Sequence, residues 1–379
     1  MEFIDLKEQY RRYRAEIDQR LNTVLGHARF ILGPEIAELE TALAQYVRVQ
    51  HCVTVASGTT SLEIALRALD IGPGDEVITV PFTWISTAEV IGLVGAKPVF
   101  IDIEPRSFNM DVEQLEQAIT PRTRAILPVS LFGQMPDYTR INAIAAQHKL
   151  PVIEDAAQSF GATQNGRPSC GVTLVASTSF FPAKPLGCFG DGGALFTNDT
   201  ALADKFRAIR THGGLRRHQH PLLGTNGRFD TLQAAVLLAK LPHFPDEVNA
   251  RANIGARYSE LLGDLCEVPL VMPGNTHVYA QYTIRVPNRD QVAEQLKTRG
   301  VPTAVYYPKC LHEQPVFAAL GYRYGDFPIS EQASREVLSL PMHSFLTPRD
   351  QDSVVAALEQ ILQTQPHSQR RGRLVPVGR

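Results

Sequence analysis

The sequence has few of the features that mark secreted, metal-binding or nucleic-acid-binding proteins. Its 379 residues include five cysteines, an odd number with no C-x-x-C spacing. That pattern predicts free thiols in a reducing compartment and argues against a disulfide framework or a zinc site. The formal net charge is only −2, so no overall field attracts nucleic acid or an anionic membrane. We therefore expect no metal, no nucleic-acid partner and no membrane partner.

The sequence also shows neither the pattern of a signal peptide nor that of a membrane span. The first residues, MEFIDLKEQYRR, carry charges from position 2 and include no apolar core. The longest apolar stretch, ISTAEVIGLVGAKPVFIDI, contains Glu89 and Lys97 and is broken by glycine and proline. With 44% hydrophobic and 20% charged residues, the composition is typical of a globular enzyme, and we expect a cytoplasmic location.

What the sequence does contain is an alternation of short β-branched runs with helical patterns. Seven runs predict strands, at residues 51–57, 75–82, 97–103, 124–131, 150–155, 176–181 and 193–198. Between the first two, Leu62, Ala65, Leu66 and Leu69 fall on one helical face. The alternation predicts an α/β fold with a large, mostly parallel seven-stranded sheet. The last runs follow one another without a full helix, which predicts at least one antiparallel pair.

The pattern changes near residue 241. A helix over about 244–263 precedes more widely separated strands such as 279–287, and further helices are expected near 290–299 and 330–338. We predict a large domain at residues 1–240, including an N-terminal helical segment, and a smaller C-terminal α/β domain at 241–362. The tail at 363–379 is basic and aperiodic, which predicts disorder.

The stretch SGTTSLE, from Ser57 to Glu63, follows the first predicted strand. Gly58 permits a tight turn, and Thr60 with Glu63 matches a capping box that opens a helix. Backbone N–H groups at a helix start, together with the hydroxyls of Thr59 and Thr60, suit a phosphate. A plain helix cap would explain the same residues.

Asp155 closes the apolar run at 150–155, at the edge of the sheet where ligands bind in open α/β folds. A carboxylate next to a buried strand is costly unless it is paired. Asp155 therefore has either a functional partner or a structural one, as the cap of a helix formed by the following AAQSF segment.

Lys184 lies between two prolines in FFPAKPLGCFGDGG, a poor environment for a charge unless its amine is held for a reaction. A rigid, partly desolvated lysine loses its proton more readily and is then a better nucleophile and base. Ser179 precedes it by five residues, and the only tryptophan, Trp84, follows the predicted strand at 75–82. Trp84 could also be a core residue.

Together these residues match the needs of pyridoxal 5'-phosphate. Asp155 would pair with the ring nitrogen, and Lys184 would form the Schiff base. The remaining residues would hold the phosphate or stack on the ring: Gly58, Thr59 and Ser179 for the phosphate, and Trp84 for the ring. The glycines after Lys184 do not match G-x-G-x-x-G, which argues against a dinucleotide site.

Several stretches also match one known family, among them FIDLKEQY, VASGTTSLEIAL, VIEDAAQSFGA, TSFFPAKPLGCFGDGGALFTND and NGRFDTLQAA. Over residues 1–362 the sequence resembles the DegT/StrS sugar-nucleotide aminotransferases, which are fold-type I pyridoxal phosphate enzymes. The resemblance implies the roles given above for Lys184 and Asp155, and it implies Gln158 at the 3-hydroxyl of the cofactor. It also implies that Asn226 reaches the phosphate of a neighbouring subunit, and hence a homodimer with shared active sites.

Within this family, SFFPAKPLGCFGDGG and GVPTAVYYP are similar to bacterial enzymes that aminate UDP-2-acetamido-2-deoxy-3-oxo-glucuronate for O-antigen assembly. By the same likeness the amino donor would be glutamate. Arg228 would bind the uronate carboxylate, or would form a structural ion pair with Asp230 or another acid. Phe30, Tyr306 and Tyr307 would face the sugar. Two alternatives stay open: a keto-6-deoxy nucleotide sugar as the substrate, and a non-catalytic protein that senses a sugar nucleotide.

Overall fold

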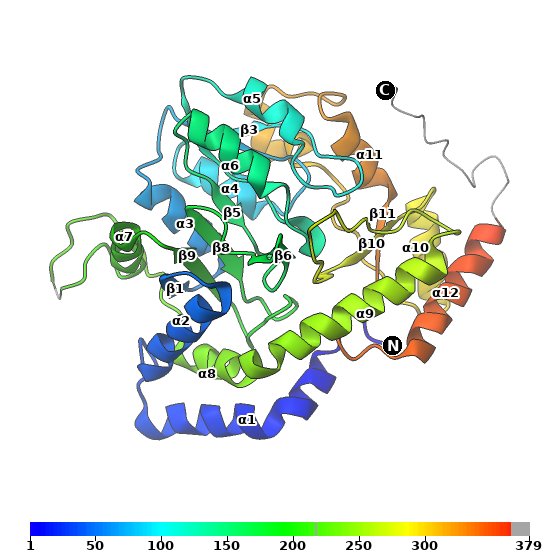
Figure 1. Cartoon of the computed structure of the whole chain (residues 1–379), viewed down its shortest axis with the longest axis horizontal. Helices are drawn as coiled ribbons and strands as arrows, with labels where there is room; N and C mark the ends of the chain where they lie inside the picture. The colour runs from blue at the N-terminus through cyan, green and yellow to red at the C-terminus, as the bar shows by residue number, and fades with distance from the viewer. Residues whose placement is uncertain (217, 365–379) are drawn as a thin grey trace.

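A computed structural model of the chain describes residues 1–216 and 218–364, and a sheet made of two groups of strands forms its centre (Figure 1). The strands are β1 (His51–Val55), β2 (Glu76–Thr79), β3 (Lys97–Phe100), β4 (Thr123–Ile126), β5 (Ile153–Asp155), β8 (Val175–Ser179) and β9 (Gly193–Thr197). They pair in the orders β1-β9-β8-β5 and β3-β2-β4. Isolated parallel bridges, Ile126 to Val152 and Val129 to Asp155, join the two groups. Each predicted run overlaps one strand, so the expected sheet is confirmed.

The strand directions are mixed in the way the spacing predicted. Strand β9 is antiparallel to both β1 and β8, whereas the pairs β5–β8, β2–β3 and β2–β4 are parallel. A parallel connection needs a crossover of a dozen or more residues, usually a helix, whereas an antiparallel one can be a loop. The connection from β8 to β9 is such a loop, and it carries Lys184.

Helices cover both faces of the sheet because neighbouring side chains in a strand point to opposite sides. In β1, Cys52 packs with residues of α2 and α8, while Val53 packs with residues of α3 and α7. Leu62, Ala65 and Leu66 of α3 are buried, as the helical pattern predicted. The helices are α1 (Leu6–His27), α2 (Pro34–Val47), α3 (Gly58–Ala68), α4 (Ser86–Leu93), α5 (Leu115–Ala118), α6 (Tyr138–Gln147), α7 (Thr200–Arg210), α8 (Thr231–Lys240), α9 (Phe244–Leu262), α10 (Arg289–Thr298), α11 (Pro328–Glu336) and α12 (Pro348–Gln363).

The C-terminal part has a core of its own. Strands β10 (Tyr282–Arg285) and β11 (Val337–Leu340) pair antiparallel, and they share a buried cluster with α9, α10 and α12. The helix expected at 330–338 ends earlier, at Glu336, because Val337 already pairs with β10. The N-terminal residues reach this part as well, since the Met342 amide donates to the Phe3 carbonyl at 3.1 Å.

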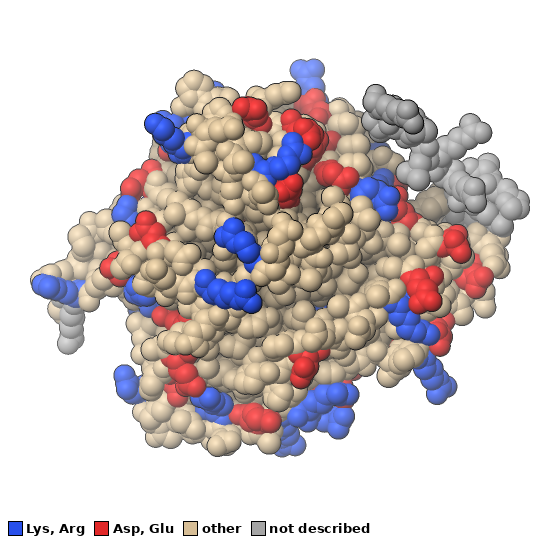
Figure 2. Space-filling model, in the orientation of Figure 1, with Lys and Arg blue, Asp and Glu red and all other residues tan. Residues whose placement is uncertain are grey.

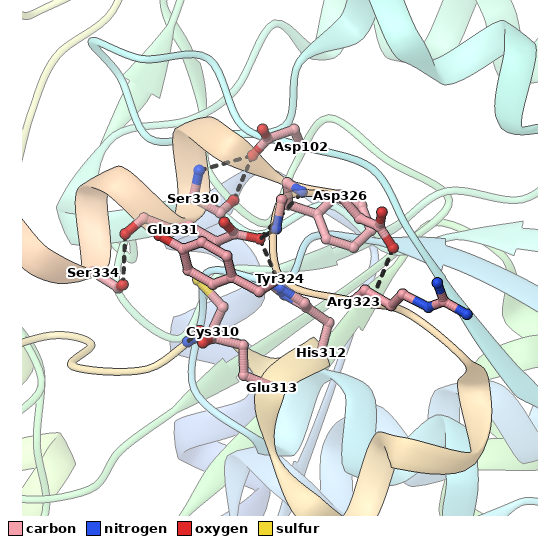
Figure 3. A network of polar contacts seen from close by, with 12 residues as sticks. Asp102, Cys310, His312, Glu313, Arg323, Tyr324, Asp326, Ser330, Glu331 and Ser334 are labelled. Atoms are coloured by element: carbon pink, nitrogen blue, oxygen red, sulfur yellow. Dashed lines mark hydrogen bonds and ion pairs between the residues drawn. The ribbon is translucent and has the colours of Figure 1, made fainter.

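Residues 304–336 of the C-terminal part contact the central sheet at β3, where Leu311, Phe317 and Phe327 pack with Phe100, and Figure 3 shows the polar contacts of this segment with Asp102. Asp102, just after β3, accepts hydrogen bonds from the backbone of Ile329 and Ser330, each at 2.9 Å, at the start of α11. His312 and Glu331, both buried, are joined at 3.1 Å. These contacts fasten the segment that carries Tyr306 and Tyr307 to the edge of the sheet.

No helix within the described ranges is long and apolar enough to cross a membrane. On the face shown in Figure 2, basic and acidic side chains are interspersed, in keeping with the net charge of −2. Of the tail at 363–379 for which disorder was predicted, Gln363 ends α12, and residues 365–379 lie outside the described residues.

Candidate active site

The first part of the candidate site is the start of α3, which follows β1 directly. Ser57 caps the helix by accepting a hydrogen bond from the Thr60 amide at 3.0 Å. The predicted capping box of Thr60 with Glu63 is therefore wrong, because the helix begins earlier, at Gly58. Glu63 instead pairs with Arg67 at 2.6 Å, one turn along α3. The first N–H groups of a helix have no acceptor within it, so they stay available to an anion.

Gly58 lies against Ser179, at the end of β8. A Cβ atom added at Gly58 would lie 2.8 Å from the Cβ atom of Ser179, so only glycine allows this approach. Beside it, the hydroxyl groups of Thr59 and Ser86 are 2.7 Å apart. The fold thus brings Gly58, Thr59 and Ser179 together in a cradle of hydroxyls at a helix N-terminus, which fits a phosphate.

Asp155 ends β5 and is only 5% exposed. Its Oδ2 accepts a hydrogen bond from Thr87 Oγ1 at 2.8 Å, and its Oδ1 accepts one from the Ala157 amide at 3.1 Å. Burial raises the pKa of this carboxyl, while the two hydrogen bonds and the charge of Lys184 lower it. Residues 157–161 form turns, so the alternative of a cap for a helix in AAQSF is wrong.

Lys184 lies in the loop between β8 and β9 and is partly buried. Its amide donates to the Phe181 carbonyl at 2.8 Å, which holds the residue in a tight turn. Burial lowers the pKa of the Lys184 amine, and the charge of Asp155 acts in the opposite direction. A buried amine and a buried carboxylate that influence one another suit a reaction centre.

Gln158 links three segments that are far apart in the sequence. Its Oε1 accepts from the Phe132 amide at 2.8 Å, and its Nε2 donates to the Tyr307 hydroxyl at 3.0 Å. The rings of Tyr307 and Trp84 lie 6.2 Å apart. Trp84 is 58% exposed, so the alternative that it is a core residue is wrong. An exposed aromatic face beside buried polar groups suits a planar ligand.

The candidate substrate residues lie on other segments. The Phe30 carbonyl accepts from the Thr231 amide at 3.0 Å, and Ile31 forms a bridge with Asp230, so the Phe30 segment runs beside the one that holds Arg228. Phe30 is an exposed side chain. Arg228 forms no ion pair with Asp230 or another acid of the described residues, and its buried Nε has no hydrogen-bond partner. The structural ion pair is therefore wrong.

Asn226 is exposed and forms a backbone bridge with Thr211. The next residue, Gly227, accepts a hydrogen bond through its carbonyl from the Ala56 amide at 2.9 Å. Asn226 therefore stands beside the turn that leads into α3 of its own chain. Tyr306 contacts the N-terminal segment, with its ring 6.5 Å from that of Phe3.

One residue of the site and one buried neighbour of it were missed from the sequence. Thr87 donates a hydrogen bond to Asp155. The sequence offered a clue to this residue, because Thr87 follows Trp84, the only tryptophan, by about one helical turn. Glu154 is fully buried, and its carboxyl accepts from Ser169 Oγ at 2.7 Å and from the Cys170 amide at 2.9 Å. Burial raises the pKa of Glu154 to about 7. Nothing in the sequence distinguishes this carboxylate from an exposed one.

The fold and this arrangement define a class of protein: a pyridoxal-phosphate-dependent transferase of fold type I, with its lysine on the loop that joins β8 to β9. The model of the DegT/DnrJ/EryC1/StrS aminotransferase family matches residues 11–359, and the chain belongs to this family. It is accordingly an aminotransferase.

Individual relatives agree with that assignment. The chain is 50% identical over 94% of its length to the UDP-2-acetamido-2-deoxy-3-oxo-D-glucuronate aminotransferase of Pseudomonas aeruginosa, 99% of which is covered. It is 48% identical over 93% of its length to the pleiotropic regulatory protein of Geobacillus stearothermophilus, 96% of which is covered.

Solved structures extend the likeness to the fold and the cofactor. A DegT DnrJ EryC1 StrS aminotransferase from Brucella abortus is 44% identical with a TM-score of 0.93, and the match covers 95% of this chain and 99% of that one. A Bacillus subtilis protein solved with bound pyridoxamine phosphate is 30% identical with a TM-score of 0.87, covering 95% and 83%.

Proposed function

We propose that this aminotransferase moves an amino group from L-glutamate to carbon 3 of UDP-2-acetamido-2-deoxy-3-oxo-glucuronate. The product would be a 3-amino sugar nucleotide for a bacterial surface polysaccharide such as O-antigen, made in the cytoplasm. The observation that carries this proposal is the 50% identity, over 94% of the chain, to the Pseudomonas aeruginosa enzyme.

The cofactor would be held by residues of four segments. Its phosphate would lie at the start of α3, on Gly58, Thr59 and Ser179, which the close approach of Gly58 to Ser179 brings together. Trp84 would stack on the ring, and Gln158 would donate to the 3-hydroxyl. When bound, pyridoxal phosphate supplies an electron sink for the pair released as a C–H bond breaks.

Asp155 and Lys184 would carry the electrostatic and proton-transfer roles at the cofactor site. The Asp155 carboxylate would keep the ring nitrogen protonated, an interaction worth about 4 kcal/mol at ~4 Å and an effective dielectric near 20. Lys184 would hold the cofactor covalently at rest. Once displaced from the cofactor, the Lys184 amine would take the proton from the carbon that bears the amino group and would then give it to a different atom. The lowered pKa of Lys184 favours this role, because more of the amine is neutral at a given pH.

Arg228 would recognise the uronate carboxylate. A guanidinium binds a carboxylate with two parallel hydrogen bonds, and the buried Nε of Arg228 has no partner in the described residues. Phe30, Tyr306 and Tyr307 would offer flat faces and hydroxyls to the sugar. A neutral keto-6-deoxy sugar would give Arg228 no carboxylate to bind.

The active form would be a homodimer with shared sites, each completed by Asn226 of the other subunit. Exposed apolar side chains on the segment before Asn226 support this, since Leu215 is 63% and Leu223 91% exposed. Mixing Lys184→Ala with Asn226→Ala protein should restore activity, because one site of the mixed dimer receives both residues. Mixtures no more active than their parents would contradict the sharing of sites between subunits.

We also propose that the chain has two domains, at residues 1–240 and 241–362.

The function is tested by incubating the holoenzyme with L-glutamate and each keto sugar nucleotide in turn. We expect the 3-amino uronate by mass spectrometry, with one 2-oxoglutarate formed per amino sugar. Turnover of a 4-keto-6-deoxy sugar in its place would establish the alternative substrate. Binding of the sugar nucleotide without any turnover would favour a sensor, which the name of the Geobacillus relative also suggests.

A further inference from the structure

A second buried lysine lies beneath the loop that carries Lys184. Lys240 is the last residue of α8, and its side chain is only 2% exposed. The ammonium donates a hydrogen bond to the Gly187 carbonyl and lies 5.7 Å from the centre of the Phe189 ring. Within the described part of the chain, Lys240 forms no ion pair with a carboxylate.

Such a group is unfavourable for folding. Burial lowers the pKa of Lys240 to about 8, and the charge of Arg251 acts in the same direction, while Glu247 and Cys188 oppose it. The Glu247 carboxylate is occupied by other donors, among them Gln9 Nε2 at 3.0 Å. Burying a charge that has no ionic partner costs free energy even when one hydrogen bond is made. Stability alone therefore does not explain this lysine.

The carbonyl that Lys240 holds belongs to the turn around Lys184. Gly187 folds back on the start of the turn, where an added Cβ atom would lie 2.4 Å from the Pro182 carbonyl oxygen. The Cys188 amide then donates to the Phe180 carbonyl at 2.8 Å and closes the base of the turn. Lys184 lies inside this closed unit, so the orientation of the Gly187 peptide sets the orientation of the turn.

We propose that Lys240 is a positioning residue for Lys184, and that its ammonium fixes the turn from which the reactive amine projects. The inference rests on the proposed role of Lys184. A charged donor holds a carbonyl more firmly than a neutral one. Reaction rates depend steeply on the alignment of the reacting group, so a small shift of the turn is costly. Gln233 holds the outer end of the same loop, because its Oε1 accepts a hydrogen bond from the Phe189 amide at 2.7 Å.

The test uses Lys240→Met, which keeps the length and removes the charge, with Lys205→Met as the matched control. Lys205 is half-buried on α7, where its ammonium pairs with Asp70 at 2.9 Å and donates to the Ala68 carbonyl at 3.0 Å. The cofactor-free proteins are exposed to pyridoxal, reduced with borohydride and digested, and the label on the Lys184 peptide is followed over time.

We expect the labelling rate of Lys184 to fall about tenfold in Lys240→Met, the effect of losing one hydrogen bond to a charged group. The control should label at the wild-type rate. Thermal unfolding of Lys240→Met at neutral pH should occur at no lower temperature than that of the wild type. Equal labelling in Lys240→Met and wild type overturns the positioning role. Labelling of Lys184 no faster than that of exposed lysines in the wild type overturns the proposed function itself.

A measurement on the unmodified protein covers the case in which Lys240→Met does not fold. Hydrogen exchange of the Cys188 amide, corrected for its intrinsic rate, is measured from pH 7 to pH 9.5. Protection should fall several-fold as Lys240 loses its proton above pH ~8, because a neutral amine is the weaker donor. Glu247, Arg251 and Cys188 are the titratable groups that face Lys240. Protection that stays constant through this range overturns the proposal.

Discussion

The cofactor side and the substrate side of the proposed active site are built differently. On the cofactor side, Asp155 and Gln158 are buried, and each makes two hydrogen bonds to residues of the same chain. On the substrate side, Phe30 is exposed, and the Arg228 Nε lacks a partner among the described residues. The first side is already held in place by the fold, whereas the second presents groups with free bonding capacity.

This difference separates chemistry from specificity. Groups fixed by buried hydrogen bonds need no reorganisation during a reaction, which suits transition-state stabilisation. Exposed groups with unused donors can be exchanged without disturbing the sheet, so relatives with different sugars can share one cofactor seat. Changes on the cofactor side should therefore lower the rate with every substrate, and changes on the substrate side should depend on which sugar is offered.

Lys184→Ala should give the largest effect. The variant should lose turnover with every keto sugar, because it lacks both the covalent attachment point and the group that moves the proton. Its fold should persist, since the Lys184 side chain forms no hydrogen bond or ion pair with another described residue. Turnover and thermal unfolding are measured side by side. Transamination above a trace in this variant would contradict the role of Lys184.

Asp155→Asn should lower turnover by about three orders of magnitude while the cofactor stays bound. The estimate converts the ~4 kcal/mol of the carboxylate–nitrogen interaction at 1.36 kcal/mol per tenfold. Glu154→Gln is the matched control, because Glu154 is the neighbouring buried carboxyl and points to the other face of β5. Its pKa of about 7 means that it carries only part of a charge near neutral pH. A loss below tenfold in Asp155→Asn would move the electron-withdrawing role elsewhere.

The cofactor side was also the more predictable of the two from sequence. Asp155, Ser179 and Gly58 stand at strand ends or a helix start, where chain order alone brings residues to one edge of the sheet. Contacts that lie within that edge but join distant segments were not predictable. Thr87 and Asp155 are 68 residues apart, and Gln158 and Tyr307 are 149 residues apart. Their pairing depends on how α4 and the 304–336 segment pack, which local patterns do not encode.

Arg228→Lys should separate the two sides of the site by substrate. Lysine keeps the charge but loses the paired hydrogen bonds, so the uronate substrate should be weakened by about 1.5–3 kcal/mol in kcat/KM, the worth of a hydrogen bond to a charged group. The neutral 6-hydroxymethyl analogue should be much less affected. Equal penalties for both substrates would show that Arg228 does not bind the carboxylate, and the keto-6-deoxy alternative would then be preferred.

Thr87→Val should give the smallest effect and act on every sugar alike. Valine keeps the volume of the buried Thr87 side chain but leaves Asp155 Oδ2 without its 2.8 Å donor. A contribution of about 1.5 kcal/mol, the lower value for a hydrogen bond to a charged group, corresponds to a loss of about tenfold in turnover at neutral pH. Thr83→Val is the control, because among the described residues the Thr83 hydroxyl forms a hydrogen bond only with that of Thr87, at 3.3 Å.

The pH dependence of turnover in Thr87→Val shows in which direction Thr87 shifts the pKa of Asp155. The hydrogen bond from Thr87 lowers the pKa of Asp155 against the rise that burial causes, so its removal raises that pKa. Asp155 is then protonated at a higher pH, and the acidic limb of the rate profile should move toward neutrality. The loss should therefore grow as the pH falls and shrink as it rises. An acidic limb at the wild-type pH, with the same loss at all pH values, would mean that Thr87 acts on packing and not on the ionisation of Asp155.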